Sequence, residues 1–123
     1  MPLVVFVDDS ETALASTKIA TKDLPIEIAQ YLSAIDALKD IKSKAIVPEL
    51  IITDLNMPVM NGLEFLKELR QIDDTKKTPV LMLTTETKQE LKEQGKALGL
   101  TGWIVKPFNP AQLQAAIKRV LRV

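Results

Sequence analysis

Apolar and polar positions alternate in blocks along the chain, and each short apolar run is followed by a longer amphipathic stretch. The runs at 2–7 and 49–54 are β-branched and apolar throughout, which is typical of strands covered on both faces. The run at 26–32 alternates and predicts a strand with one more exposed face. Two further strands are predicted at 78–85 and 102–106.

The amphipathic stretches between these runs predict helices. The predicted helices cover 10–24, 34–44, 61–72, 87–100 and 109–123. Ser10 is a candidate N-cap, the third helix is expected to start near Asn61, and Asn109 followed by Pro110 favours a helix start. Gly99 is expected to end the fourth helix.

Apolar residues at helical spacing mark the expected core side of these helices. The first helix carries Leu14 and Ile19 together with several alanines. The second places Ile35, Leu38 and Ile41 at this spacing. The expected core positions of the last helix are Leu113, Ile117, Val120 and Leu121.

Five repeats of strand then helix, joined by short connections, predict an α/β fold with a parallel sheet and helices on both faces. The 123 residues fit one domain, 1–123, and are enough for a core without disulfides. No linker or low-complexity segment is visible, and no output domain is expected.

Composition removes several kinds of chemistry. The chain has no cysteine and no histidine, which excludes thiol catalysis, cysteine-ligated zinc and the commonest general base. Its 16 basic and 16 acidic residues balance, so direct nucleic-acid binding is not expected. No apolar run is long enough to suggest membrane insertion, and the first residues lack the pattern of a secretory signal, so a cytoplasmic location is expected.

Chemistry-bearing residues follow four of the five predicted strands. Asp8 and Asp9 follow the first strand, Asp54 follows the third, Thr84 and Thr85 close the fourth, and Lys106 closes the fifth. Ligands of an open parallel sheet bind beyond the carboxyl ends of its strands, so these side chains are expected at one edge. Clustered carboxylates need a cation, and Mg²⁺ with oxygen ligands and a phosphate oxygen fits this set.

The absence of a phosphate-binding glycine loop argues against ATP as a direct substrate. An aspartate can itself be the nucleophile and form an aspartyl-phosphate, and Asp54 is the candidate acceptor. Asp8 and Asp9 would then hold the metal, while Thr84 and Lys106 would bind phosphoryl oxygens. Each residue alone has a simpler structural explanation, such as a helix start or a turn. Their joint position at one sheet edge favours the functional interpretation.

Four segments resemble the receiver domain of two-component response regulators. They are "VDDS" at 7–10, "ITDLNMPVMNGLEFL" at 52–66, "PVLMLTTE" at 79–86 and "GWIVKPF" at 102–108. The resemblance extends over essentially the whole chain and is strongest to the CheY-like single-domain chemotaxis type. It implies a flavodoxin-like (βα)5 fold with a five-stranded parallel sheet in the order 2-1-3-4-5.

The resemblance also implies how the phosphoryl group would be received. Asp54 would take it from a phosphohistidine on a sensor histidine kinase or a phosphotransfer protein. Mg²⁺, for which Mn²⁺ is expected to substitute, would be bound by Asp9, Asp54 and the backbone carbonyl of Asn56, with Asp8 acting largely through water. Lys106 would contact the phosphoryl oxygens and Asp54.

The same resemblance assigns switching and tuning roles. Thr84 would swing toward the phosphate, and the aromatic side chain of Trp103 would move inward with it. Asn56 and Glu86 match positions that tune autodephosphorylation, and Thr85 stands where a smaller residue is common and would narrow access to the acceptor. The Lys106–Pro107 bond is expected to be cis.

A downstream protein target is expected on the face formed by 87–100, 102–106 and 109–123. The chain would then be a signalling switch, with chemotaxis as one pathway that fits, and it would catalyse only its own phosphoryl transfer and hydrolysis and be no enzyme in the usual sense.

Other interpretations stay open at this point. A Mg²⁺-dependent phosphohydrolase of the aspartyl-phosphate type would usually place a second aspartate two residues after the nucleophile, where this chain has Asn56. A degenerate receiver that serves as a docking or scaffold module is opposed by the intact set of candidate residues. The chain is alternatively a fragment or a designed shuffle of a longer regulator.

Overall fold

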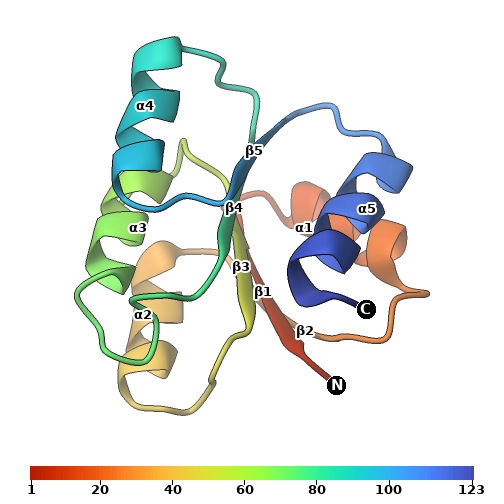
Figure 1. The fold of residues 1–123 in the computed structure, drawn as a ribbon, viewed down its shortest axis with the longest axis horizontal. Coiled ribbons are helices and arrows are strands. Elements are labelled where there is room, and N and C mark those ends of the chain that lie inside the picture. The colour runs from red at the N-terminus through yellow and green to blue at the C-terminus, as the bar shows by residue number, and fades with distance from the viewer.

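The computed structural model describes all residues 1–123 and contains five strands that alternate with five helices (Figure 1). The strands are β1 (Leu3–Val7), β2 (Glu27–Tyr31), β3 (Leu50–Thr53), β4 (Val80–Thr84) and β5 (Gly102–Val105). The helices are α1 (Glu11–Thr21), α2 (Ala34–Lys42), α3 (Gly62–Leu69), α4 (Gln89–Ala97) and α5 (Pro110–Leu121). Each predicted element is present, usually shorter by a few residues at its ends.

All five strands are parallel and lie in the order β2-β1-β3-β4-β5. The order and the helices on both faces confirm the predicted flavodoxin-like fold. In the register of the central pair, Val7 lies opposite Thr53, and in the outer pair Thr84 lies opposite Val105. Within each of these two pairs the carboxyl ends therefore lie level, and the residues that follow the strands meet at one edge.

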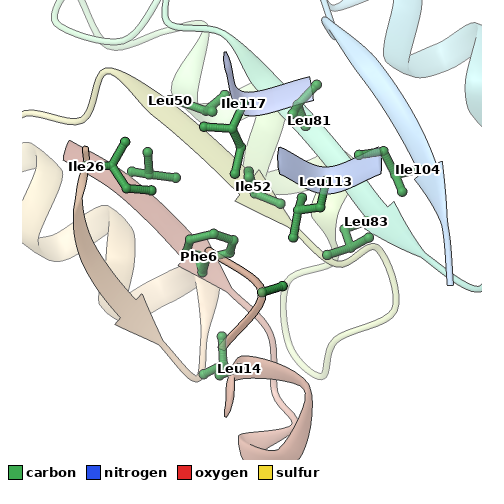
Figure 2. Close-up of a cluster of buried hydrophobic side chains, with 12 residues drawn as sticks. Phe6, Leu14, Ile26, Leu50, Ile52, Leu81, Leu83, Ile104, Leu113 and Ile117 are labelled. Atoms are coloured by element: carbon green, nitrogen blue, oxygen red, sulfur yellow. The ribbon is translucent and has the colours of Figure 1, made fainter. Parts of the chain in front are cut away.

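Two helical layers cover the sheet. Helices α1 and α5 lie on one side, and α2, α3 and α4 lie on the other (Figure 1). Successive strand residues alternate between these layers, so Phe6 packs in the core under α1 and α5, while Val5 and Val7 pack in the core under α2 and α3. Figure 2 shows the first of these cores, in which Leu113 and Ile117 of α5 lie over the sheet. Both faces are buried, which explains why the central strands are apolar throughout.

Side-chain caps begin four of the helices. The hydroxyl of Ser10 accepts a hydrogen bond from the Ala13 amide at 3.1 Å, and Ser33 caps α2 in the same way. Asn61 and Glu64 form a reciprocal capping box at the start of α3. Asn109 caps α5, with Pro110 at its first turn, as the sequence predicts.

Helix α1 differs from its prediction in length and in its buried side. It ends at Thr21, three residues before the predicted end. Ile19 is 68% exposed, whereas Thr17 and Thr21 are buried beside Leu14. The buried threonine hydroxyls donate to the carbonyls of Leu14 and Thr17, so their burial leaves no polar group unsatisfied. The prediction from helical spacing that Ile19 lies on the core side of α1 was therefore wrong.

Three other apolar positions are less buried than predicted. Ile35 is 46% exposed, because the buried side of α2 runs through Ala34, Ala37, Leu38 and Ile41. Val120 and Leu121, near the end of α5, are only half-buried against the same core as Leu113 and Ile117.

Helix α4 has the weakest anchoring of the five. Its buried side consists of Gly95 alone, and Lys88 at its N-cap makes no side-chain cap. Gly99 follows its end with φ of +77°, the left-handed conformation that glycine adopts without strain. No helix in the structure combines the length and apolar character needed to cross a membrane.

Candidate functional site

Four of the predicted site residues meet at the carboxyl edge of the sheet. Asp8 and Asp9 follow β1, Asp54 follows β3, and Lys106 follows β5. Carboxylate oxygens of the three aspartates all lie within 4.8 Å of one another. Parallel register produces this arrangement, because β1 and β3 are neighbours whose last residues lie side by side.

The three carboxylates differ in their surroundings. Asp8 is buried, and its Oδ1 accepts a hydrogen bond from the Ser10 amide at 3.0 Å. Asp54 is half-buried, and its Oδ1 accepts from the Leu55 amide at 2.7 Å. Asp9 is exposed and makes neither a hydrogen bond nor an ion pair. Backbone amides thus hold the carboxylates of Asp8 and Asp54, whereas the Asp9 carboxylate has no partner within the chain.

Lys106 is the cation that compensates the two inner carboxylates. Its Nζ lies 2.6 Å from Asp8 Oδ2 and 3.4 Å from Asp54 Oδ2. Burial by itself lowers the pKa of Lys106, but hydrogen bonds and negative charges from Asp8 and Asp54 outweigh it, so the pKa lies above its ordinary value. The ammonium therefore stays charged at neutral pH. In this structure its closer partner is Asp8, whereas the family resemblance emphasises the contact with Asp54.

Gly62 lets helix α3 start directly behind Asp54. Its amide donates to the Leu55 carbonyl at 2.8 Å. A Cβ at this position would overlap the Asp54 carbonyl oxygen and lie 2.9 Å from Met82 Sδ. Only glycine fits without displacing the backbone of the candidate acceptor. Sequence reasoning missed this role, although the Asn61–Gly62 pair after the acceptor segment was its visible signal.

Thr84 and Glu86 are engaged with the start of the β4–α4 connection. Thr84 is fully buried, and its Oγ1 accepts from the Glu86 amide at 3.3 Å. The Glu86 carboxylate accepts from the amides of Thr87 and Lys88. Thr85 and Asn56 are both exposed at the same edge. The predicted roles of these four residues in switching and tuning stay predictions.

Trp103 on β5 contacts both the loop that follows β4 and the small core beside Asp54. Its Nε1 donates to the Glu86 carbonyl oxygen at 2.9 Å, and the Lys92 ammonium lies 6.0 Å from the ring centroid. The indole packs against the small core of Leu55, Leu63 and Met82, and Leu55 directly follows Asp54. One side chain thus contacts both the loop after Thr84 and the core beside the candidate acceptor. The Lys106–Pro107 bond is cis, as the resemblance implies.

A hollow of about 630 Å³ adjoins the site on the side of α1. Thr85 and Lys106 form its boundary with the acidic cluster, and Phe108 and Ile19 belong to its largely apolar lining. The exposed Ile19 therefore faces a concave surface next to the candidate acceptor.

The donor set of the acidic cluster fits a hard divalent cation. All its ligand atoms would be oxygens, which Mg²⁺ prefers, and the cluster holds more carboxylates than the one Lys106 ammonium compensates. The carbonyl of Asn56 accepts no hydrogen bond within the chain and is a further available oxygen.

Comparison with known proteins agrees with the fold. The family model "Response regulator receiver domain" matches residues 4–118. The chemotaxis protein CheY-3 of Vibrio cholerae is 33% identical over 118 residues, which are 95% of this chain and 89% of that protein. The solved structure of Vibrio cholerae CheY4 is 43% identical, with a TM-score of 0.89 and 98% of each chain covered.

Relatives of this chain also include parts of longer proteins. The sensor histidine kinase CheAY of Helicobacter pylori is 27% identical over 98% of this chain, which spans only 15% of that kinase. Sequences similar to this chain thus make up most of some proteins and only a small part of others.

A parallel sheet in the order 2-1-3-4-5, with carboxylates and a lysine at its carboxyl edge, defines the class of two-component signalling receivers. The chain belongs to the response regulator receiver domain family and is homologous to CheY chemotaxis proteins.

Proposed function

We propose that Asp54 accepts a phosphoryl group from a phosphohistidine of a sensor histidine kinase or phosphotransfer protein. The observation that carries this proposal is the position of Lys106, whose ammonium lies between Asp8 and Asp54 within a three-carboxylate cluster. The likeness to part of a protein named as a sensor histidine kinase supports a donor of this type.

In the transfer, a carboxylate oxygen of Asp54 attacks phosphorus, the P–N bond of the donor breaks, and the released imidazole nitrogen takes a proton. The amide of Leu55 holds the other Asp54 oxygen, which keeps the carboxylate oriented. Lys106 would supply a fixed positive charge for the phosphoryl oxygens, and the buried Thr84 hydroxyl would turn toward them. This is self-directed chemistry, so we do not class the chain as an enzyme acting on an external substrate.

We further propose that Mg²⁺, or Mn²⁺ in its place, binds Asp9, Asp54 and the carbonyl of Asn56, with Asp8 beside it. When bound, such an ion neutralises the charge that builds up on the phosphoryl oxygens. Backbone amides and Lys106 already hold the carboxylates of Asp8 and Asp54, so these ligands would be oriented before the ion binds.

The donor is proposed to dock over the hollow beside α1. This surface shares Thr85 and Lys106 with the site, and its apolar lining suits a helix that presents a phosphohistidine. The output is proposed to be a protein partner bound at the α4–β5–α5 face, as in chemotaxis signalling. A cytoplasmic location and a single domain over 1–123 are parts of the same proposal.

The alternatives are less well supported. An amide at Asn56 cannot serve as the acid or base that a phosphohydrolase of this type requires. A scaffold role would not need three carboxylates within 4.8 Å of one another and Lys106 paired with two of them.

The test uses the fluorescence of Trp103, the single tryptophan of the chain. We expect one saturable change with Mg²⁺ and a second with beryllofluoride, a stable mimic of aspartyl-phosphate. Asp54→Asn should lose the second change. Asp36→Asn, an exposed aspartate on α2, is the matched control and should respond like the wild-type chain.

Absence of both responses, together with no Mg²⁺ binding by direct titration, would contradict the proposal and favour the scaffold role. A beryllofluoride response that survives in Asp54→Asn would contradict Asp54 as the acceptor.

A further inference from the structure

The dipeptide Asn61–Gly62 joins the loop after β3 to helix α3 and combines the two residues most prone to deamidation. An asparagine loses its amide when the backbone nitrogen of the next residue attacks its side-chain carbonyl carbon. Glycine favours this attack, because no Cβ hinders the approach. The other two asparagines of the chain precede Met57 and Pro110. A methionine side chain hinders the attack, and proline has no N–H to give up.

The reaction is a ring closure followed by hydrolysis. Hydroxide removes the Gly62 amide proton, the nitrogen bonds to Cγ of Asn61, and the Cγ–Nδ2 bond breaks with release of ammonia. Water then opens the cyclic imide at one of its two carbonyls. Cleavage between the nitrogen and Cγ gives aspartate, and cleavage between the nitrogen and the main-chain carbonyl carbon gives isoaspartate. Isoaspartate inserts an extra methylene into the backbone.

The folded chain holds both reacting groups. Gly62 is buried, and its amide donates to the Leu55 carbonyl oxygen at 2.8 Å. While this bond is closed, hydroxide does not reach the amide proton. The Asn61 side chain is held as well, because its Oδ1 accepts from the Glu64 amide at 2.9 Å. The Glu64 carboxylate accepts in turn from the Asn61 amide at 2.9 Å, which completes the capping box.

The turn directly before Asn61 is strained in the folded chain. Val59 has φ of +71°, a left-handed conformation that β-branched residues rarely adopt, and its side chain is 91% exposed. The Met60 amide donates to the Pro58 carbonyl at 2.8 Å, so Val59 is the middle residue of a tight turn. Local opening of residues 58–62 releases this strain. We therefore expect this segment to open more often than the whole chain unfolds.

Isoaspartate at position 61 would act on the candidate acceptor. The backbones of Gly62 and Asp54 are so close that a Cβ on Gly62 would overlap the Asp54 carbonyl oxygen. An extra methylene just before Gly62 is incompatible with this contact and with the bond to Leu55. Aspartate, by contrast, keeps the backbone length and a capping oxygen, and its negative charge suits a helix start.

We propose that Asn61–Gly62 is a deamidation site that the folded β3–α3 connection holds closed, and that isoaspartate formed there separates the start of α3 from Asp54. The chemistry of the site and its protection by the fold are independent of the proposed function. Only the consequence for phosphoryl acceptance at Asp54 rests on that function.

The first experiment follows the loss of the amide by peptide mass spectrometry during incubation at mildly alkaline pH, in native buffer and in urea. We expect Asn61 to deamidate about tenfold or more slowly in the folded chain, while Asn56 and Asn109 stay intact in both. Glu64→Ala should speed the loss about threefold in native buffer and leave the rate in urea unchanged, because half of the capping box is removed. Glu68→Ala, which removes no side-chain hydrogen bond from the same helix, is the matched control.

The second experiment separates the products formed in urea by chromatography and refolds them. The isoaspartate form should lose the beryllofluoride response of Trp103. Asn61→Asp, which reproduces the other product, should keep it. Asn61→Ser retains a capping oxygen and has no amide to lose, so it should respond fully even after the same incubation.

Equal rates in native buffer and urea, or equal rates in Glu64→Ala and Glu68→Ala, would overturn the protection by the fold. Loss at Asn56 as fast as at Asn61 would overturn the assignment of the site. An isoaspartate form that responds to beryllofluoride like the fresh chain would overturn the consequence at Asp54.

A fresh wild-type chain without a beryllofluoride response would contradict the proposed function alone. The isoaspartate form would then be judged by urea unfolding, in which its midpoint should lie below that of Asn61→Asp. Equal midpoints would overturn the displacement of α3.

Discussion

At the scale of single residues, Asp9 is the member of the acidic cluster that the fold does not require. It is exposed and makes no hydrogen bond or ion pair, yet its carboxylate lies within the cluster. Its presence beside two other carboxylates costs electrostatic energy unless a cation is bound. Asp9 therefore belongs to the proposed metal function and not to stability.

Asp9→Asn is expected to leave the metal-free free energy of unfolding unchanged or raise it by up to about 0.5 kcal/mol, because a repulsion is removed. The added stability from Mg²⁺ should fall to less than half of the wild-type value, because a ligand is lost. Urea unfolding with EDTA measures the metal-free free energy of unfolding, and urea unfolding with Mg²⁺ at the same ionic strength measures the stability that the ion adds. Glu11→Gln is the control. If Mg²⁺ raised the free energy of unfolding of Asp9→Asn as much as that of the wild-type chain, Asp9 would be excluded as a ligand.

Tyr31 shows how a single pair of residues responds to pH. Its hydroxyl donates to Asp40 Oδ2 at 2.7 Å. Burial, followed by the hydrogen bond and the charge of Asp40, raises the pKa of Tyr31 from 10.0 to about 12. The folded chain thus keeps the phenol neutral where the unfolded chain ionises it. The resulting stability is complete below pH 10 and is lost as pH rises through about 12.

Absorbance titration of Tyr31, the single tyrosine, should give a midpoint near 12 in the wild-type chain. In Asp40→Asn the pKa should fall toward 10 without reaching it, because burial remains the largest cause. Asp36→Asn serves as the control on the same helix. An unchanged midpoint in Asp40→Asn would show that Asp40 does not act on Tyr31.

At the scale of elements, Arg70 fastens the end of α4 to the end of α3. Its guanidinium donates to the carbonyls of Leu98 and Gly99 after α4, and to those of Thr75 and Thr78 in the α3–β4 connection. The carbonyls of Leu98 and Gly99 directly follow α4 and lie beyond its intrahelical hydrogen bonds, and α4 itself buries only Gly95. The weakly packed α4 is therefore held mainly at its two ends, by Arg70 at one and by the Trp103–Glu86 bond near the other.

Arg70→Ala is expected to lower the free energy of unfolding by about 2 kcal/mol, because charge-assisted hydrogen bonds to four carbonyls are lost. Arg70→Lys should recover little of this, because an ammonium cannot reproduce the planar fork. Urea unfolding measures the loss, and hydrogen exchange should show faster amides around 98–101. Lys67→Ala on the same helix is the control, and a loss below about 0.5 kcal/mol in Arg70→Ala would contradict this role.

At the scale of the whole molecule, the sheet separates two cores of similar size. Ile117 lies in the core under α5, and Ile41 lies in the core under α2. The side chains do not touch, but both depend on the same central strands. The chain should therefore unfold as one unit, although substitutions in the two cores act independently.

Ile41→Val and Ile117→Val are each expected to cost about 1 kcal/mol, since each removes one buried methylene. The double variant should show the sum within about 0.5 kcal/mol. Circular dichroism and Trp103 fluorescence should report the same urea transition. Separate transitions for the two probes would instead show that the layers unfold independently.

Local patterns in the sequence were enough to predict the order and type of all ten elements. Continuous apolar runs, N-cap residues such as Ser10 and Asn61, and strand–helix alternation are local signals, and they required no knowledge of distant contacts. The placement of Asp8, Asp54 and Lys106 at one edge also followed, because parallel strands bring their carboxyl ends together.

Tertiary structure alone decided what depends on contacts between distant segments. Ile19 is exposed and Thr17 buried because α1 meets both the sheet and α5, and helical spacing does not specify the angle of that contact. The nearer partner of Lys106 and the closeness of Gly62 to the Asp54 carbonyl depend on ångström-scale packing between elements. A net charge of zero likewise carries no information about where charges gather, and only the fold places Lys92 and Lys96 of α4 and Arg119 of α5 on either side of β5.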